Sequence, residues 1–162
     1  MQYRVRVAAT AFFDRPAEVP RAQVMRSNRS PEAKAESDEY ADLIRHIRTS
    51  TRGDEFILSA VADMSRLFVN DAMLYFLADR LPATRWIEME PGLTNTEKGQ
   101  RELIEALESR NVRTIILRTL TSHEPNATSR SNGVHLFDEY VRRGFVGSRR
   151  FGAYEVLVRR GT

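Results

Sequence analysis

The chain has 162 residues, a length that fits one domain built around one hydrophobic core. Hydrophobic residues make up 41% and charged residues 29%, which excludes a disordered chain, and no apolar run is long enough for a membrane span, so we expect a soluble domain. The sequence has no cysteine, which excludes disulfides and thiolate metal sites.

Arginine dominates the basic residues of this chain. The net charge is +3, and only two of the 25 basic residues are lysines. A surplus of arginine is typical of proteins that contact phosphate or nucleic acid. The 22 acidic residues are interleaved with the basic ones, however, and this favours arginine-rich codon usage as the explanation. We therefore expect no nucleic-acid partner.

Residues 1–31 are predicted to form an N-terminal extension or linker. An alternation of apolar and basic residues near the start indicates a short edge strand, and no signal peptide is recognisable. Residues 14–31 contain three prolines and few large apolar side chains, as expected of a linker. Residues 32–162 are predicted to form a single α/β domain.

The regular part of the chain begins with a helix that Ser30 and Pro31 introduce. This helix is expected to end near residues 51–54. Its apolar residues recur at helical spacing; they are Tyr40, Leu43, Ile44 and Ile47. An apolar run at 56–61 predicts a buried strand. Asn70 is predicted to cap the next, short helix, which the Leu81-Pro82 pair would stop.

Residues 85–90 are predicted to form the second strand. Thr94 and Glu97 have the spacing of a capping box at the start of a longer helix, and Asn111 suits the position just past its end. An almost continuous apolar run at 112–117 predicts the third strand.

The last part of the domain is predicted to be a helix and a hairpin. The helix spans 134–143 and stops at Gly144. Residues 151–159 alternate between apolar and polar side chains, which indicates a half-exposed strand, and they are expected to pair with 145–146 across a turn at Gly147 and Ser148.

These elements predict the α/β class. Three strands joined by helices run parallel with right-handed crossovers, so the expected architecture is a three-layer Rossmann-like sandwich. Its sheet would be mostly parallel, with an antiparallel strand at the C-terminus. The loops after the carboxyl ends of the strands gather at one edge of such a sheet, where ligands bind. Here they are residues 62–69, 91–95 and 119–133.

Two of these loops contain candidate ligand-binding residues. The loop at 119–133 holds Ser122, His123, Glu124 and Asn126, which suit a sugar or phosphate, and His123 with Glu124 could act as an acid–base pair. The first loop holds Asp63, Ser65 and Arg66, a carboxylate close to the end of a strand. The alternative for both loops is an ordinary solvated connection made of turn-forming residues, and the sequence favours that alternative.

Other candidate sites are weaker. The segment after the first strand has no glycine, which excludes a dinucleotide-binding or P-loop site because backbone cannot approach phosphate closely there. Glu88 and Glu90 would face one side of a strand, as paired carboxylates at a metal site do, but they lack a partner at a recognisable spacing. His46 and His135 are predicted to be surface residues on helices. We expect no metal and no cofactor.

Several segments resemble a known family. They are LYFLADRLPATRW at 74–86, EPG at 90–92, TEKGQRELIEALESRNVRTIIL at 96–117, EPN at 124–126 and GAYEVLVRR at 152–160. Over about residues 36–160 the chain resembles the C-terminal domain that follows the membrane helices of bacterial multi-span glycosyltransferases. These enzymes use polyprenol-phosphate sugars and are related to protein mannosyltransferases and arabinosyltransferases.

The resemblance implies a non-catalytic accessory domain, because the catalytic carboxylates of those enzymes lie in their membrane part. It implies the membrane part of a parent protein as partner, a glycan or polyprenol-phosphate as ligand, and a place on the outer side of the bacterial membrane. Without the resemblance, a cytoplasmic place is expected. Two alternatives remain open: a small free-standing enzyme that uses His123 and Glu124, and a protein-interaction module.

Overall fold

The computed structural model describes residues 31–66, 70–90, 92–119 and 130–161, so most of the predicted N-terminal extension lies outside the described residues. The described chain alternates helices and strands. In chain order the elements are α1 (Pro31–Ser50), β1 (Phe56–Val61), α2 (Met73–Ala78), β2 (Leu81–Pro82), α3 (Glu97–Ser109), β3 (Thr114–Arg118), α4 (Leu136–Gly144), β4 (Phe145–Phe151) and β5 (Tyr154–Arg159).

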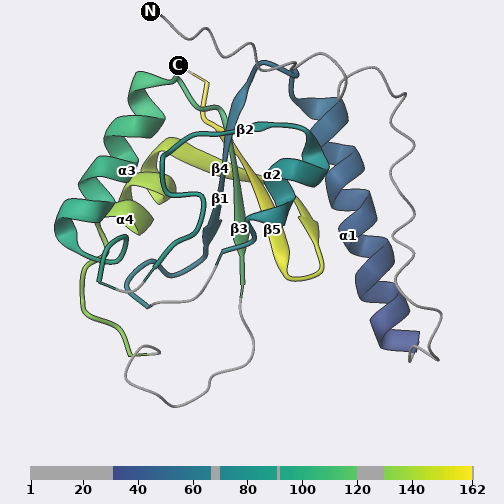
Figure 1. The fold of residues 1–162 in the computed structure, drawn as a ribbon, viewed down its shortest axis with the longest axis horizontal. Helices are drawn as coiled ribbons and strands as arrows, with labels where there is room; N and C mark the ends of the chain where they lie inside the picture. The colour runs from purple at the N-terminus through teal and green to yellow at the C-terminus, as the bar shows by residue number, and fades with distance from the viewer. Residues whose placement is uncertain (1–30, 67–69, 91, 120–129, 162) are drawn as a thin grey trace, which may run out of the picture.

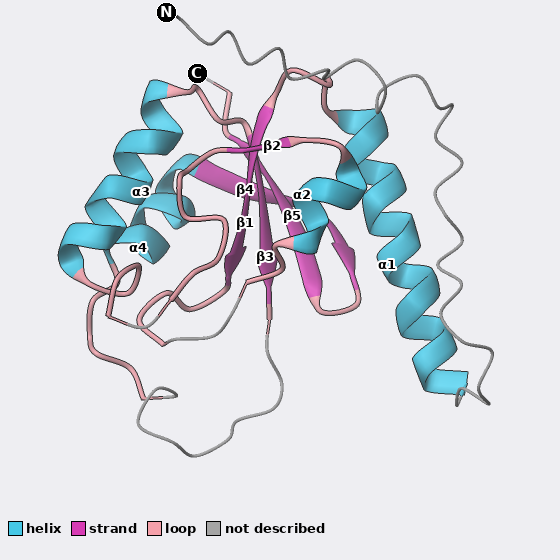
Figure 2. Cartoon of the chain, in the orientation of Figure 1, coloured by secondary structure: helices cyan, strands magenta, loops and turns pink. Residues whose placement is uncertain are grey.

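The strands form one five-stranded mixed sheet in the order β2-β1-β3-β5-β4. β1 runs parallel to β2 and β3, whereas β5 is antiparallel to both of its neighbours, β3 and β4 (Figure 2). The predictions of an α/β fold, of a parallel centre and of an antiparallel C-terminal strand are confirmed. The finer assignment to a Rossmann-like sandwich stays a prediction.

Helices cover both faces of the sheet (Figure 1). Leu58, Ile115 and Leu157 point to one face and belong to the core shared with α3 and α4. Their neighbours along the strands point to the other face and belong to the core shared with α1 and α2; these are Ile57, Ile116 and Val156. Because side chains alternate along a strand, each strand end can present groups to two separate surfaces.

The first helix agrees with its prediction. α1 starts at Pro31 and buries Leu43, Ile44 and Ile47 completely or nearly so. At its end the guanidinium of Arg80 donates hydrogen bonds to the carbonyl of Arg48 (2.9 Å) and to that of Thr51 (2.8 Å). These bonds satisfy carbonyl groups that a helix end leaves without a partner.

The second strand was predicted in the wrong place. Residues 85–90 are not a strand; β2 consists of Leu81 and Pro82, which pair with Phe56 and Ile57 of β1. Proline lacks an N–H group and cannot donate to a sheet. It is tolerated here because β2 is short and lies at the edge of the sheet. Asn70 holds the 85–90 segment instead: its amide donates to the carbonyl of Ile87 (2.9 Å).

Two predicted helix starts also differ from the structure. α2 begins at Met73, and the carboxylate of Asp71, not the side chain of Asn70, accepts the N–H of Leu74 (3.2 Å). α3 is capped by Thr96, whose hydroxyl accepts the N–H of Gly99 (3.0 Å). The predicted capping box of Thr94 and Glu97 was therefore wrong, because the cap lies two residues after Thr94. A capping pattern in the sequence does not show which of two neighbouring threonines adopts the extended backbone that a cap needs.

The C-terminal hairpin is longer than predicted. β4 continues through Gly147 and Ser148, which were predicted to form the turn, and a register shift between Gly147 and Arg149 accommodates the extra residue. The turn lies at Gly152, whose φ of 52° falls in the left-handed region that glycine adopts readily. The structure confirms a left-handed residue after α3 at Asn111, with φ of 48°.

Candidate functional site

The carboxyl ends of β1 and β3 bring together loops that are distant in the sequence. The N–H of Asn132 donates to the carbonyl of Ser65 (3.0 Å), and the buried amide of Gln100 donates to the carbonyls of Met64 (3.3 Å) and Val134 (2.9 Å). The described parts of the loops 62–69 and 119–133 therefore lie side by side, as expected. The candidates Ser122, His123, Glu124 and Asn126 lie outside the described residues.

A pocket of about 410 Å³ lies at this end of the sheet, between α1 and the turn that joins β4 and β5. Its walls come from four separate parts of the chain. They are Glu36, Ser37, Glu39, Tyr40, Asp71, Arg118, Phe151, Gly152, Ala153 and Tyr154.

One carboxylate organises the floor of this pocket. The hydroxyls of Tyr40 and Tyr154 both donate to Oδ2 of Asp71, at 2.8 and 2.9 Å. The centroids of the two rings are 5.5 Å apart. Burial raises the pKa of each phenol, and the neighbouring Asp71 carboxylate raises it further. Asp71 is fixed in turn by the N–H of Leu74, so the three side chains form a preorganised group.

Arg118 brings the positive charge of the pocket. Its guanidinium carbon lies 5.7 Å from the centre of the Tyr154 ring. Its Nε is buried and has no hydrogen-bond partner among the described residues. Three carboxylates line the same pocket, those of Glu36, Glu39 and Asp71, so its charge is predominantly negative.

The sequence did not identify this pocket. Tyr40 was assigned to the apolar stripe of a helix and Tyr154 to an alternating strand, while Asp71 and Arg118 were not named at all. Tyr40 and Tyr154 are 31 and 83 residues from Asp71, and no local spacing connects positions so far apart.

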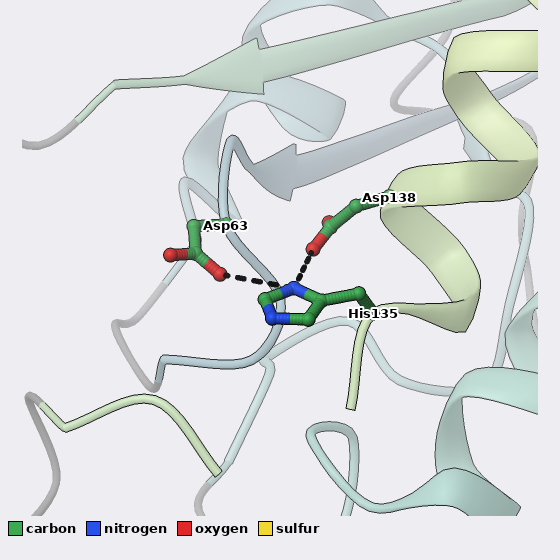
Figure 3. A group of neighbouring side chains, drawn as sticks. All are labelled: Asp63, His135 and Asp138. Atoms are coloured by element: carbon green, nitrogen blue, oxygen red, sulfur yellow. Dashed lines mark hydrogen bonds and ion pairs between the residues drawn. The ribbon is translucent and has the colours of Figure 1, made fainter. Parts of the chain in front are cut away.

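A second polar cluster lies on the opposite face, where the loop after β1 meets the start of α4 (Figure 3). Nδ1 of His135 is 3.2 Å from Oδ2 of Asp138 and 4.0 Å from Oδ1 of Asp63. Oδ1 of Asp63 also accepts the hydroxyl of Ser65 (2.6 Å). Nε of Arg66 lies 3.0 Å from Oδ2 of Asp63 in an ion pair.

Asp138 is the most enclosed member of this cluster, with 13% of its side chain exposed. Burial raises its pKa, whereas hydrogen bonds from the N–H of Met64 and from His135 act in the opposite direction. The bond from Met64 (3.1 Å) ties the start of α4 to the end of β1. The Asp138 carboxylate is thus held in one orientation, although its burial removes part of its favourable hydration.

The structure therefore brings three candidates from the first loop, Asp63, Ser65 and Arg66, into a single cluster. Ser65 is fully buried. His135 was predicted to be a surface residue on a helix; it is exposed, as predicted, but it precedes α4 as its N-cap residue and contacts Asp138. The sequence could have indicated this contact through the three-residue spacing between His135 and Asp138, because an N-cap residue lies beside the residue at the third helical position.

The remaining candidates contribute nothing to either cluster. Glu88 and Glu90 are exposed and lie outside any strand, so the prediction that they share one face of a strand was wrong. His46 is half-buried, with its ring centroid 5.3 Å from that of Phe151, and burial lowers its pKa. It was predicted to be a surface residue.

We expect the free energy of unfolding to fall as the pH rises above about 10, the ordinary pKa of tyrosine. In the folded chain Tyr40 and Tyr154 have raised pKa values and stay protonated, whereas in the unfolded chain they ionise, so the stability that they provide is complete below pH 10 and is lost above it. Because both side chains are partly exposed, each should account for up to about 1 kcal/mol between pH 9 and pH 11.

Urea unfolding at pH 9 and pH 11 measures this loss. Tyr40→Phe and Tyr154→Phe should each reduce the difference between the two pH values, because phenylalanine does not ionise. Burial also raises the pKa values of Tyr75 and Tyr140, so these two tyrosines add to the loss, and each phenylalanine variant should remove only part of it. Equal pH dependence in the two variants and the original chain would contradict the expectation.

Among the described residues, no helix is both long and apolar enough to cross a membrane. No family model matches the chain, and no curated protein matches it. Among solved structures, the C-terminal globular domain of an oligosaccharyltransferase from Archaeoglobus fulgidus aligns with a TM-score of 0.42 and 10% sequence identity, over 75% of this chain and 97% of that domain. Similarity at this level does not define a family or a function.

Proposed function

We propose that this chain is a non-catalytic accessory domain of a membrane glycosyltransferase-like protein, and that it binds a glycan in the pocket around Asp71. The observation that carries the proposal is the group formed by Tyr40, Asp71 and Tyr154 beside Arg118. The sequence resemblance over residues 36–160 supports the choice of parent protein. The partner would be the membrane part of that parent, and the domain would lie on the outer side of the membrane.

The pocket has the chemistry that a polyol needs. Carboxylate oxygens accept hydrogen bonds from sugar hydroxyls, and the guanidinium of Arg118 donates them. The rings of Tyr40 and Tyr154 provide apolar surface with an electron-rich face for the C–H groups of a sugar ring. Few polar groups around an apolar wall are typical of small-molecule sites.

The charge of the pocket decides between two kinds of ligand. A polyprenol-phosphate sugar would place its phosphate beside Arg118, but Glu36, Glu39 and Asp71 would repel it. A neutral glycan meets no such repulsion. We therefore favour a neutral glycan over a lipid-phosphate sugar.

Ligand titrations followed by amide chemical shifts test the proposal. The probes are a panel of neutral disaccharides and a short-chain polyprenyl-phosphate sugar. We expect a neutral disaccharide to shift resonances of Tyr40, Arg118 and Tyr154. In Arg118→Gln its affinity should fall about three- to tenfold, because a shorter, neutral amide replaces the charge-assisted hydrogen bond from the guanidinium. The unfolding free energy should fall by less than about 1 kcal/mol, because Arg118 Nε has no hydrogen-bond partner among the described residues and the contact with the Tyr154 ring is long, at 5.7 Å.

The matched control is Arg142→Gln, which removes an exposed arginine from the last turn of α4. Its affinity for the disaccharide should equal that of the original chain. If only the phosphate-bearing probe binds, the preference for a neutral glycan is wrong. If neither probe shifts the pocket resonances, or if the Arg118 and Arg142 variants bind equally, the glycan site is wrong.

A further inference from the structure

We propose that Asp63, His135 and Asp138 form a binding site for one divalent transition-metal cation, of the zinc or manganese class. The site lies where the loop after β1 meets the N-terminus of α4 (Figure 3). It is on the opposite face of the sheet from the pocket around Asp71, so the two proposals stand or fall separately.

The distances between the three donor atoms fit one cation. Nδ1 of His135 is 3.2 Å from Oδ2 of Asp138 and 4.0 Å from Oδ1 of Asp63, and all three atoms lie within 4.8 Å of one another. In a tetrahedral zinc site with bonds of 2.0–2.2 Å, neighbouring donor atoms are about 3.4 Å apart. The observed separations lie on either side of this value, so small side-chain movements complete the site.

Hydrogen bonds from the backbone already orient the two carboxylates. The N–H of Met64 donates to Oδ1 of Asp138 (3.1 Å), which leaves Oδ2 facing the imidazole. The N–H of Ser65 (3.1 Å) and its hydroxyl (2.6 Å) both donate to Oδ1 of Asp63, the oxygen that faces His135. Such outer contacts fix the ligands of metal sites in proteins. Oδ2 of Asp138 contacts only His135 among the described residues, so it keeps an acceptor position for a cation. At Oδ1 of Asp63 both acceptor positions are taken by Ser65, so a cation would replace the bond from the Ser65 hydroxyl.

The donor set selects the kind of cation. One imidazole nitrogen with carboxylate oxygens suits zinc and manganese, whereas copper(I) prefers thiolate or thioether ligands. Magnesium and calcium prefer oxygen ligands alone, so they should bind more weakly. His135 and Asp63 have 46% and 42% of their side chains exposed, which leaves one side open for water to complete the coordination.

A substitution at Arg66 distinguishes a metal site from a cluster that only holds α4 against the loop. Its Nε lies 3.0 Å from Oδ2 of Asp63, so its positive charge opposes a second cation at the cluster. If the cluster exists to bind metal, Arg66→Gln should tighten binding. If the cluster is only a cap that joins α4 to the loop, the same change should have no effect on metal ions.

The experiment is a calorimetric titration of the full chain with ZnCl₂, MnCl₂ and MgCl₂. We expect one zinc ion per chain, weaker binding of magnesium, and at least about tenfold weaker zinc binding in His135→Gln and in Asp138→Asn. Arg66→Gln should bind zinc more tightly. His46→Gln is the control, because it removes a histidine from the other face of the sheet.

Asp138→Asn also separates binding from folding. The introduced amide keeps an oxygen that accepts the N–H of Met64, so the urea unfolding curve should stay cooperative while zinc binding weakens at least about tenfold. A cooperative curve with unchanged zinc affinity in this variant would overturn the proposal. Three other results would also overturn the metal site: equal losses of zinc affinity in His46→Gln and His135→Gln, magnesium binding as tight as zinc binding, or no zinc binding at all.

Discussion

Gly99→Ala should lower the free energy of unfolding by about 3 kcal/mol, although glycine to alanine inside a helix normally stabilises it by up to about 1 kcal/mol. Gly99 lies in the first turn of α3, and a Cβ atom there would overlap the backbone carbonyl of Leu93 and press against the Cα of Thr94. Backbone cannot move aside as a flexible side chain can. The overlap should therefore outweigh the gain in helix propensity.

The turn before α3 also supports the carboxyl edge of the sheet. The carbonyl of Asn95 accepts hydrogen bonds from the side chains of Asn132 and Gln100. A displaced turn would disturb these contacts, so the change should reach the segment before α4. Amide chemical shifts of residues 131–134 in Gly99→Ala would show this displacement.

Gly144→Ala is the matched control for this prediction. Gly144 is the last residue of α4, and a Cβ atom there would meet no heavy atom within 4 Å. Its backbone is outside the left-handed region, so alanine should stabilise the domain by about 0.5 kcal/mol. Urea midpoints of the two variants measure both effects. Equal midpoints would contradict the steric explanation.

Asn70→Asp should cost about 3 kcal/mol at pH 7, because it places a buried charge against two carbonyl groups. Asn70 is 4% exposed, and its amide donates to the carbonyls of Ser59 (3.0 Å) and Ile87 (2.9 Å). Its oxygen accepts the N–H of Met89 (2.9 Å). A carboxylate keeps the last bond, but its second oxygen faces the two carbonyls without a proton to donate.

The cost should depend on pH in a definite direction. Burial and the facing carbonyls raise the pKa of the introduced carboxyl in the folded chain above its ordinary value of about 3.9. The loss of unfolding free energy in Asn70→Asp should therefore be smallest below pH 3.9, where the carboxyl is protonated in both states and can donate one hydrogen bond. It should grow as the pH rises from there to the folded pKa and stay constant above it. Urea unfolding at pH 4 and pH 7, with the original chain at each pH as reference, measures it.

Asn70→Leu separates charge from the loss of hydrogen bonds. Leucine has the same branched arrangement of four side-chain heavy atoms and removes all three bonds, but it does not titrate. Its loss of unfolding free energy should therefore be the same at both pH values. If Asn70→Asp shows no more pH dependence than Asn70→Leu, repulsion between the carboxylate and the carbonyls is not the cause of its instability.

The sequence predicted the elements whose burial follows a regular period. The apolar stripe of α1, the continuous apolar runs of β1 and β3, and the alternation in β5 all lie where they were expected. These patterns suffice because each element buries its own face against the core. The parallel strand directions followed from the helices between the strands, and the antiparallel one from the tight turn expected in the C-terminal hairpin.

The errors fall where contacts between distant residues decide the structure. β2 has only two residues and carries Pro82, so neither periodicity nor propensity marks it as a strand. Residues 85–90 look like a strand, but Asn70 binds their backbone in place of a neighbouring strand.

The same limit applies to the candidate sites. Asp63, Ser65 and Arg66 were identified because they follow β1 directly in the chain. Asp71 and its two tyrosines were missed because the fold alone brings α1, the loop before α2 and β5 together. Residues in one loop can be recognised as neighbours from the sequence, whereas a pocket built from four segments cannot.

The register shift in β4 has a consequence for self-association. Among the described strands, β4 forms one edge of the sheet, and an uninterrupted edge strand would offer its free N–H and C=O groups to a second molecule. The irregularity between Gly147 and Arg149 interrupts that row, and the exposed, positively charged side chain of Arg149 adds repulsion between two such edges. At the other edge, Pro82 removes one N–H group from β2. Both borders of the sheet thus disfavour the strand-to-strand pairing that leads to aggregation.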